Sequence, residues 1–91
     1  MTINYYALYD DVSAKFKNPV PFVNDADSIR AFADAVQRCD EKPQDGFYHK
    51  DLAMYRIGTF DDGTGVFTSN VKRLSDYLSV KKSISEVSSD D

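Results

Sequence analysis

The feature that most constrains the fold of this chain is a short turn between two stretches that have the composition of strands. Residues 61–65 read Asp-Asp-Gly-Thr-Gly and are flanked by aromatic and β-branched residues. Glycine readily adopts the positive φ angles that tight hairpin turns need, so Gly63 and Gly65 predict a β-hairpin at this point. We expect its two strands at residues 52–60 and 66–69.

The pairing of these two strands predicts which side chains share a face of the sheet. We expect Phe60 to pair with Val66, and side chains then alternate between the two faces along each strand. One face is predicted to carry Arg56, Gly58, Phe60, Val66 and Thr68. The other set is more apolar and is expected to face a helix: Tyr55, Ile57, Thr59 and Phe67.

A second hairpin is predicted at the N-terminus. Residues 3–9 are rich in aromatic residues that favour strands, and an Asp-Asp pair then indicates a turn. Residues 13–17 alternate in polarity and are expected to form the returning strand. Pro19 and Pro21 are expected to end it, because proline cannot donate a hydrogen bond to a neighbouring strand.

The segment after the prolines has the pattern of an amphipathic helix. Residues 24–27 read Asn-Asp-Ala-Asp, in which an Asn or an Asp side chain can cap the first N–H groups and the acids suit the positive end of the helix dipole. An apolar stripe with helical spacing follows: Ile29, Phe32, Ala33 and Val36. We expect the helix to end near Cys39 and to dock on the sheet, because a helix of about 14 residues is marginal alone in water.

A short second helix and a tail are predicted at the C-terminus. Asn70 is the expected cap of a helix with Val71, Leu74 and Leu78 on one side. Beyond Val80, serines and acids predict a frayed tail. The expected fold class is therefore α+β, with order ββαββ: a four-stranded, mainly antiparallel sheet with one main helix on one face. We place one domain at residues 1–80 and a flexible acidic tail at residues 81–91.

The chain carries no motif that matches an enzyme, metal or cofactor site. The lysine that a phosphate-binding loop needs before Thr64 is absent. Asp61 and Asp62 lack the ligand spacing and the closing glutamate of an EF-hand calcium loop. The single histidine, His49, and the single cysteine, Cys39, lack the partners that catalysis requires. We expect a non-enzymatic protein with no catalytic residues, no metal and no cofactor.

Charge and cysteine content limit the setting and the partners. The net charge is −4, but residues 1–85 are almost neutral because three of the fifteen acids lie in the last six residues. This balance is not that of a strong duplex-DNA binder, although it is compatible with single strands held by stacking. The chain has one cysteine, its N-terminus lacks the pattern of a signal peptide, and it has no apolar run of membrane length. These features predict a protein of a reduced, intracellular setting.

Aromatic and basic side chains are predicted to meet on the sheet face away from the helix. If the faces of three strands coincide there, aromatic rings alternate with cations, a surface that can stack bases and follow a phosphate backbone. The candidate nucleic-acid-binding residues are Tyr5, Tyr9, Lys15, Lys17, Arg56 and Phe60. The same aromatic surface is equally typical of a protein interface, and the sequence leaves both interpretations open.

Two segments, residues 21–32 and 55–67, resemble a known family. The first has Asn24 before a helix that carries Arg30 and Phe32, and the second reads IG.FDD.TG.F at its fixed positions. In this order, over about residues 5–67, the chain resembles the small nonstructural protein of gokushoviruses, single-stranded DNA phages of the Microviridae.

The resemblance implies a phage protein that is made in the cytoplasm of the host bacterium and is absent from the mature capsid. It implies DNA binding during genome replication or packaging, and it supplies no catalytic residues. The first hypothesis is therefore a protein that binds single-stranded DNA. The alternative is a homodimeric interaction module that engages a phage or host protein.

Overall fold

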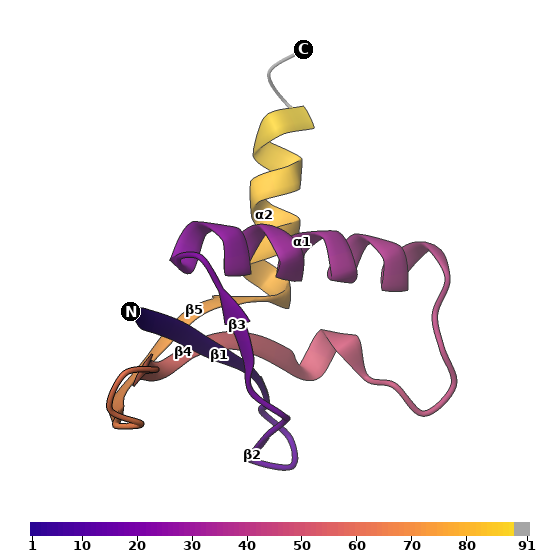
Figure 1. Ribbon diagram of the computed structural model, residues 1–91. Coiled ribbons are helices and arrows are strands. Elements are labelled where there is room, and N and C mark those ends of the chain that lie inside the picture. Colours follow the sequence, from indigo (N-terminus) through magenta and orange to yellow (C-terminus); the bar gives the residue numbers. More distant parts are fainter. Residues whose placement is uncertain (89–91) are drawn as a thin grey trace.

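Five strands form one sheet in the computed structural model, which describes the chain from residue 1 to residue 88 (Figure 1). β1 and β4 are its central strands, β5 forms one edge, and the short strands β2 and β3 both pair with β1 on the other side. These pairings are antiparallel. The strands are β1 (Thr2–Asp10), β2 (Lys15–Phe16), β3 (Val20–Phe22), β4 (Leu52–Asp61) and β5 (Phe67–Asp76).

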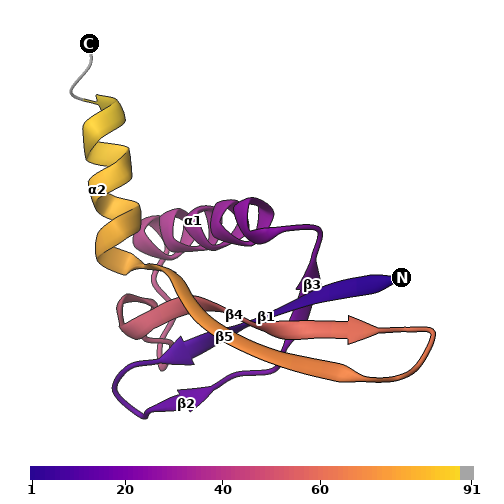
Figure 2. The ribbon, with the colours of Figure 1, turned by 90° about the vertical axis from the view of Figure 1, so that its left-hand side faces the viewer.

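The helices lie on one side of this sheet (Figures 1 and 2). α1 (Asp25–Glu41) crosses over the strands, and η1 (His49–Asp51) is a single 3-10 turn that leads into β4. α2 (Tyr77–Ser88) follows β5 directly and points away from the sheet. The predicted α+β fold is confirmed: a mainly antiparallel sheet, one main helix on one face and a short C-terminal helix.

The sheet has one strand more than the sequence predicts. The first hairpin forms as expected, with Tyr9 opposite Phe16, but the proline-containing segment then returns to β1 as β3. Pro21 stands opposite Tyr5 in this pairing. Proline is tolerated there because β3 lies at the edge of the sheet, where an outward hydrogen bond is not required.

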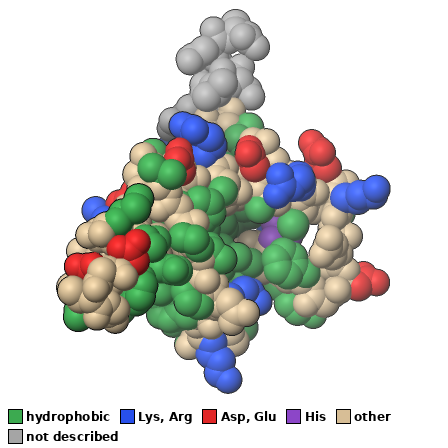
Figure 3. Space-filling view, in the orientation of Figure 1, with side chains coloured by type: hydrophobic (Ala, Val, Ile, Leu, Met, Phe, Trp, Pro, Cys, Tyr) green, Lys and Arg blue, Asp and Glu red, His purple; other side chains and the backbone are tan. Residues whose placement is uncertain are grey.

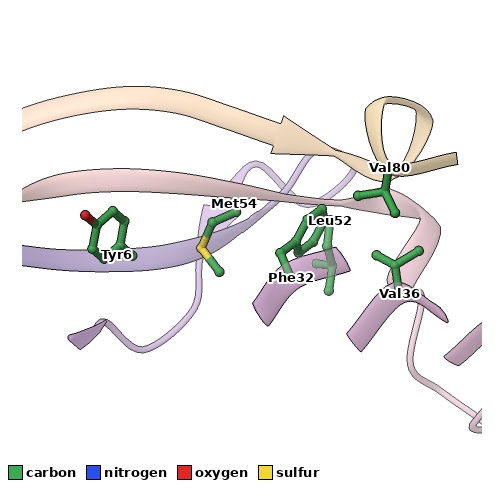
Figure 4. Close-up of a cluster of buried hydrophobic side chains, with 6 residues drawn as sticks. All are labelled: Tyr6, Phe32, Val36, Leu52, Met54 and Val80. Carbon is green, nitrogen blue, oxygen red and sulfur yellow. The ribbon is translucent and has the colours of Figure 1, made fainter. Parts of the chain in front are cut away.

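The core forms where α1 meets β1 and β4. The Asn24 side chain accepts a hydrogen bond of 2.8 Å from the Asp27 amide, so the predicted helix start is confirmed and Asn24 is its cap. Phe32 and Val36 of the predicted stripe are buried, whereas Ile29 and Ala33 are only half-buried. Burial of each large apolar side chain stabilises the fold by about 2 kcal/mol. The buried cluster consists of Tyr6, Phe32, Val36, Leu52, Met54 and Val80 (Figure 4).

A polar contact fixes the start of α1 on the sheet. The Tyr6 hydroxyl donates a 2.8 Å hydrogen bond to one carboxylate oxygen of Asp25, and Arg56 Nη1 donates one of 2.8 Å to the other. The pKa of Tyr6 is raised to about 12, mainly because the side chain is buried and also because it donates a hydrogen bond to Asp25. Both sheet groups therefore hold the Asp25 carboxylate beside the positive end of α1, where a negative charge is stabilising.

The pairing of β4 with β5 differs from the predicted one. Phe60 stands opposite Phe67, not Val66. Val66 stays in the turn, where its carbonyl accepts a hydrogen bond from the Asp61 amide and Gly65 donates one back to Asp61. Phe67 consequently shares a face with Phe60, and the prediction that it faces the helix is wrong.

A bulge in β4 moves further side chains to unpredicted faces. Tyr5 pairs with Gly58 and Tyr6 with Arg56, so that Ile57 is an extra residue on β4. Beyond the bulge, Gly58 and Phe60 share the face of Tyr5; before it, Arg56 shares the face of Tyr6. The predicted common face of Arg56 and Phe60 is therefore wrong.

The predicted C-terminal boundaries are also wrong in part. Residues 70–76 continue β5 instead of starting a helix at Asn70, because residues 72, 73, 75 and 76 of this stretch pair with β4. α2 begins at Tyr77, and the Asp76 carboxylate accepts a 2.8 Å hydrogen bond from the Ser79 amide. The helix then runs to Ser88, through part of the predicted tail, and residues 89–91 of that tail lie outside the described residues.

Gly58 provides a test of the bulge. A Cβ atom at this position would meet the Thr68 carbonyl oxygen and lie 2.7 Å from the Phe67 ring. We expect Gly58→Ala to lower the free energy of unfolding by about 1–3 kcal/mol, the usual effect of overpacking, as measured by urea denaturation. Gly63→Ala is the matched control, because its Cβ would only approach the Asp61 side chain in the exposed turn. Equal stability of Gly58→Ala and the wild type would contradict the described pairing.

Candidate functional site

The sheet face opposite the helices presents six aromatic rings, and we call this surface the aromatic face. On β1, Tyr5 and Tyr9 alternate with the buried Tyr6, so their side chains leave the sheet on the other side. Tyr9 faces Phe16 across the first hairpin, and Phe60 faces Phe67 across the second. The six rings are those of Tyr5, Tyr9, Phe16, Tyr55, Phe60 and Phe67.

One part of the aromatic face is a groove of about 400 Å³ near the second hairpin. The Tyr5 ring contacts the Phe60 ring edge-on, with centroids 6.4 Å apart, and lies 6.5 Å from the Phe67 ring. Pro19 and Ile57 complete the lining. The groove depends on the β4 bulge, because Gly58 leaves the space that the Phe67 ring occupies.

The other part of the aromatic face is a cluster of three rings near the first hairpin. The Tyr9 ring lies 4.7 Å from Phe16 and 5.3 Å from Tyr55, measured between centroids. Phe16 and Tyr55 also meet edge-on at 5.3 Å. Contacts of this kind contribute about 0.5–1.5 kcal/mol beyond area burial and hold the rings in place.

Arg73 of β5 brings a positive charge to the three-ring cluster. Its guanidinium carbon lies 5.7 Å from the Tyr55 ring centroid, and Nη1 donates a 3.2 Å hydrogen bond to the Tyr55 hydroxyl. The same guanidinium makes two hydrogen bonds of 2.9 and 3.0 Å to Asp11 and one of 3.2 Å to Asp76. The bonds from Arg73 hold the pKa of Asp11 below its usual value.

The three predicted cations lie on the other side of the sheet from these rings. Because Tyr9 pairs with Phe16, the neighbouring Lys15 and Lys17 point to the opposite face. The Lys17 ammonium lies 5.9 Å from the Phe47 ring centroid, away from the aromatic face. The predicted placement of both lysines beside the tyrosines is therefore wrong.

Arg56 is the third displaced cation. Its ion pair with Asp25, at 2.8 Å, holds the side chain under the start of α1. Of the six predicted residues, the structure thus brings Tyr5, Tyr9 and Phe60 to one face and separates the three cations from them.

Four residues of the aromatic face were not among the predicted site residues. They are Phe16, Tyr55, Phe67 and Arg73. Phe16 required the observed pairing with Tyr9, which places Phe16, and not the neighbouring lysines, on the face of the tyrosines. Tyr55 and Phe67 required the correct strand register, and Arg73 required β5 to extend beyond Ser69.

Figure 3 shows how charge is distributed over one side of the molecule. Hydrophobic side chains gather across the middle, and lysine and arginine side chains project around the periphery. The purple side chain in this view is the single histidine, His49.

That histidine belongs to a polar cluster on the helix side of the sheet. His49 Nε2 lies 2.7 Å from an Asp40 carboxylate oxygen, and the Tyr77 hydroxyl and Lys81 ammonium donate to the same carboxylate at 3.1 and 2.9 Å. The cluster joins the end of α1, η1 and the start of α2. Within the described residues, no group of three His, Cys, Asp or Glu side chains is placed to hold a metal ion.

The Asp40 cluster predicts how stability depends on pH. The hydrogen bonds from His49 and then Lys81 hold the pKa of Asp40 well below its usual 3.8. A carboxylate whose pKa is lower in the folded state than in the unfolded state stabilises the fold at pH values above the unfolded-state pKa. This stabilisation is lost progressively as the pH falls from the unfolded-state pKa through the folded-state pKa. We expect the melting temperature of Asp40→Asn to fall less between about pH 6 and pH 3 than that of the wild type.

Asp45→Asn, in the exposed loop after α1, is the matched control for this measurement and should follow the wild type. Parallel melting curves for Asp40→Asn and the wild type at all pH values would show that the carboxylate does not stabilise the fold.

The fold and this surface define a small α+β protein. Helices cover one face of its sheet, and aromatic side chains occupy the other face. The chain belongs to the phage ORF5 protein family, whose model matches residues 3–80. The matched region extends from β1 into α2 and so includes the whole aromatic face. The predicted phage origin is thereby confirmed at the level of a phage protein family.

No curated protein and no solved structure matches the chain. In the described part, no helix is long and apolar enough to span a membrane.

Proposed function

We propose that this phage protein binds single-stranded DNA on its aromatic face. In this proposal it acts by binding and not by catalysis, in the cytoplasm of the host bacterium. It serves genome replication or packaging in a phage of the gokushovirus type. The observation that carries the proposal is the set of six rings on an uncovered face of a sheet.

The geometry of the rings supports binding by stacking. Phe16 and Phe67 are 45% and 46% exposed, so a base can reach them. Their ring-to-ring contacts hold them in place before a ligand arrives. Stacking of one base on an aromatic side chain contributes about 1–3 kcal/mol and is tolerant of sequence. Two stacking positions, the groove and the three-ring cluster, lie along β1 at Tyr5 and Tyr9.

The charges around the face predict a weak dependence on salt. Lys15, Lys17 and Arg56 point to the other side, and the guanidinium of Arg73 is shared with two carboxylates. Few phosphates can then be neutralised, and each contributes about −0.7 to the slope of log K against log salt for a single strand. We therefore expect a slope no steeper than about −2.

Fluorescence anisotropy with a labelled single-stranded oligonucleotide tests the proposal. We expect Tyr5→Ala and Phe67→Ala each to weaken binding about 10-fold or more, because each removes a stacking surface. Tyr48→Ala is the matched control, since Tyr48 is 69% exposed but lies in the loop before η1. Lys17→Ala should also bind like the wild type.

Circular dichroism spectra of the variants show whether each keeps its fold. The proposal fails if the wild type does not bind at low salt. It also fails if folded Tyr5→Ala and Phe67→Ala bind as tightly as Tyr48→Ala.

A second function is favoured by the displaced cations. With its lysines on the other side, the aromatic face has the apolar character of a protein interface, and a second copy or another phage or host protein can cover it. Light scattering separates the two functions. A stable dimer that Phe67→Ala converts to monomer would support the second function and oppose the first.

A further inference from the structure

Arg73 is the positive charge that the described residues place beside the rings of the aromatic face. It stands opposite Tyr55 in the pairing of β4 with β5, so both side chains lie on the same face. Its guanidinium carbon is 5.7 Å from the Tyr55 ring centroid, and Nη1 donates to the Tyr55 hydroxyl. The three-ring cluster of Tyr9, Phe16 and Tyr55 therefore has a cation at its border.

A carboxylate occupies the side of this guanidinium that is suited to a phosphate. Nη1 and Nη2 of Arg73 donate hydrogen bonds of 2.9 and 3.0 Å to Oδ1 and Oδ2 of Asp11. Arginine binds carboxylate and phosphate groups in this same bidentate geometry, because both present two oxygens to the two N–H groups. Asp11 is thus placed where a phosphate group would bind.

The pair can open without a change in the fold. The side chains of Arg73 and Asp11 are 39% and 44% exposed, and an exposed ion pair contributes little to stability. The Asp11 backbone amide is bonded to the Asp51 carbonyl, so release of Arg73 requires only rotation of the Asp11 side chain. Asp76, the second carboxylate on Arg73, is held in place because it also accepts the Ser79 amide in the first turn of α2.

We propose that Asp11 occupies Arg73 in the free protein and that a phosphate of the bound single strand takes its place. This inference rests on the proposed function of the aromatic face, and it assigns the phosphate contact of that site to Arg73. Bases stacked on the three rings hold the strand while its phosphate replaces Asp11 at Nη1 and Nη2. Because one ion pair is exchanged for another, Asp11 lowers the affinity of the site and restricts Arg73 to ligands that also stack.

A purely structural role of the pair predicts a different result. If the pair only fastened the first hairpin to β5, loss of either partner would disturb the same rings and weaken binding. In an exchange, the two losses have opposite effects. Removal of the Asp11 charge frees Arg73 for the phosphate, whereas removal of the Arg73 charge deletes the phosphate contact and leaves Asp11 unpaired beside the strand.

Fluorescence anisotropy with a labelled single-stranded oligonucleotide, over a series of salt concentrations, tests the exchange. We expect Asp11→Asn to bind about 3-fold more tightly than the wild type and Arg73→Gln about 3-fold more weakly, which is the order of effect of an exposed ion pair. The slope of log K against log salt should become steeper for Asp11→Asn by up to about 0.7, the value for one phosphate of a single strand.

Asp45→Asn is the matched control, because it removes one negative charge from the exposed loop after α1. It should change the affinity much less than Asp11→Asn does. In the Arg73→Gln background the two aspartate variants should have equal effects, because Asp11 then has no guanidinium to release. Circular dichroism spectra show whether each variant keeps its fold.

Two sets of outcomes separate this inference from the proposed function. The exchange alone is overturned if Tyr5→Ala and Phe67→Ala lose affinity but Asp11→Asn binds like Asp45→Asn. It is equally overturned if Asp11→Asn and Arg73→Gln both weaken binding. If neither the wild type nor Asp11→Asn binds at low salt, the exchange and the proposed function are overturned together.

Discussion

The contact between Asp25, Tyr6 and Arg56 is the interaction on which the rest of the structure depends. Two hydrogen bonds of 2.8 Å, one from a central strand and one from its neighbour, hold the first turn of α1 on the sheet. The contact requires Tyr6 and Arg56 to be opposite each other, and the bulge at Ile57 provides this. A positive charge that would otherwise lie among the aromatic rings is thereby used to anchor the helix.

The two faces of the sheet consequently differ in chemistry. The helix side holds the buried core, the Asp25 contact and the Asp40 cluster, with the ion pairs of Arg56, His49 and Lys81. The other side holds six rings, an apolar groove and one arginine that is shared with two carboxylates. That side therefore offers a ligand mainly aromatic stacking surfaces and little free positive charge. This difference is the basis of our proposal that the face binds a single strand with exposed bases and not a duplex with its phosphates outside.

Local signals in the sequence predicted the parts of the fold that local interactions determine. Asn24 and the apolar spacing of Phe32 and Val36 located α1, and the glycines of residues 61–65 located the second hairpin. The face of each strand residue depends instead on pairing with distant residues. The bulge at Ile57 and the shift of the β4–β5 register by one residue at Val66 have a large effect on the two faces. Arg56 lies on the helix side and Phe67 on the other side, the reverse of the predicted arrangement.

The C-terminal boundary failed for a related reason. Val71, Leu74 and Leu78 have helical spacing, but pairing with β4 extends the strand through the first two. For the candidate site, the sequence therefore predicted the shared face of Tyr5 and Tyr9 correctly, but it placed Lys15, Lys17 and Arg56 on the wrong face. The family match covers residues 3–80 and agrees with the phage origin that the sequence motifs indicated.

The most direct test of this account is a titration of the protein with single-stranded oligonucleotide, followed by the NMR signals of the aromatic side chains. The account predicts that the ring signals of Tyr5, Tyr9 and Tyr55 shift together on binding, while those of the buried Tyr6 and of Tyr77 on the helix side stay in place. Shifts confined to Tyr77 and to the surroundings of Lys17, with the three aromatic-face tyrosines unchanged, would contradict it.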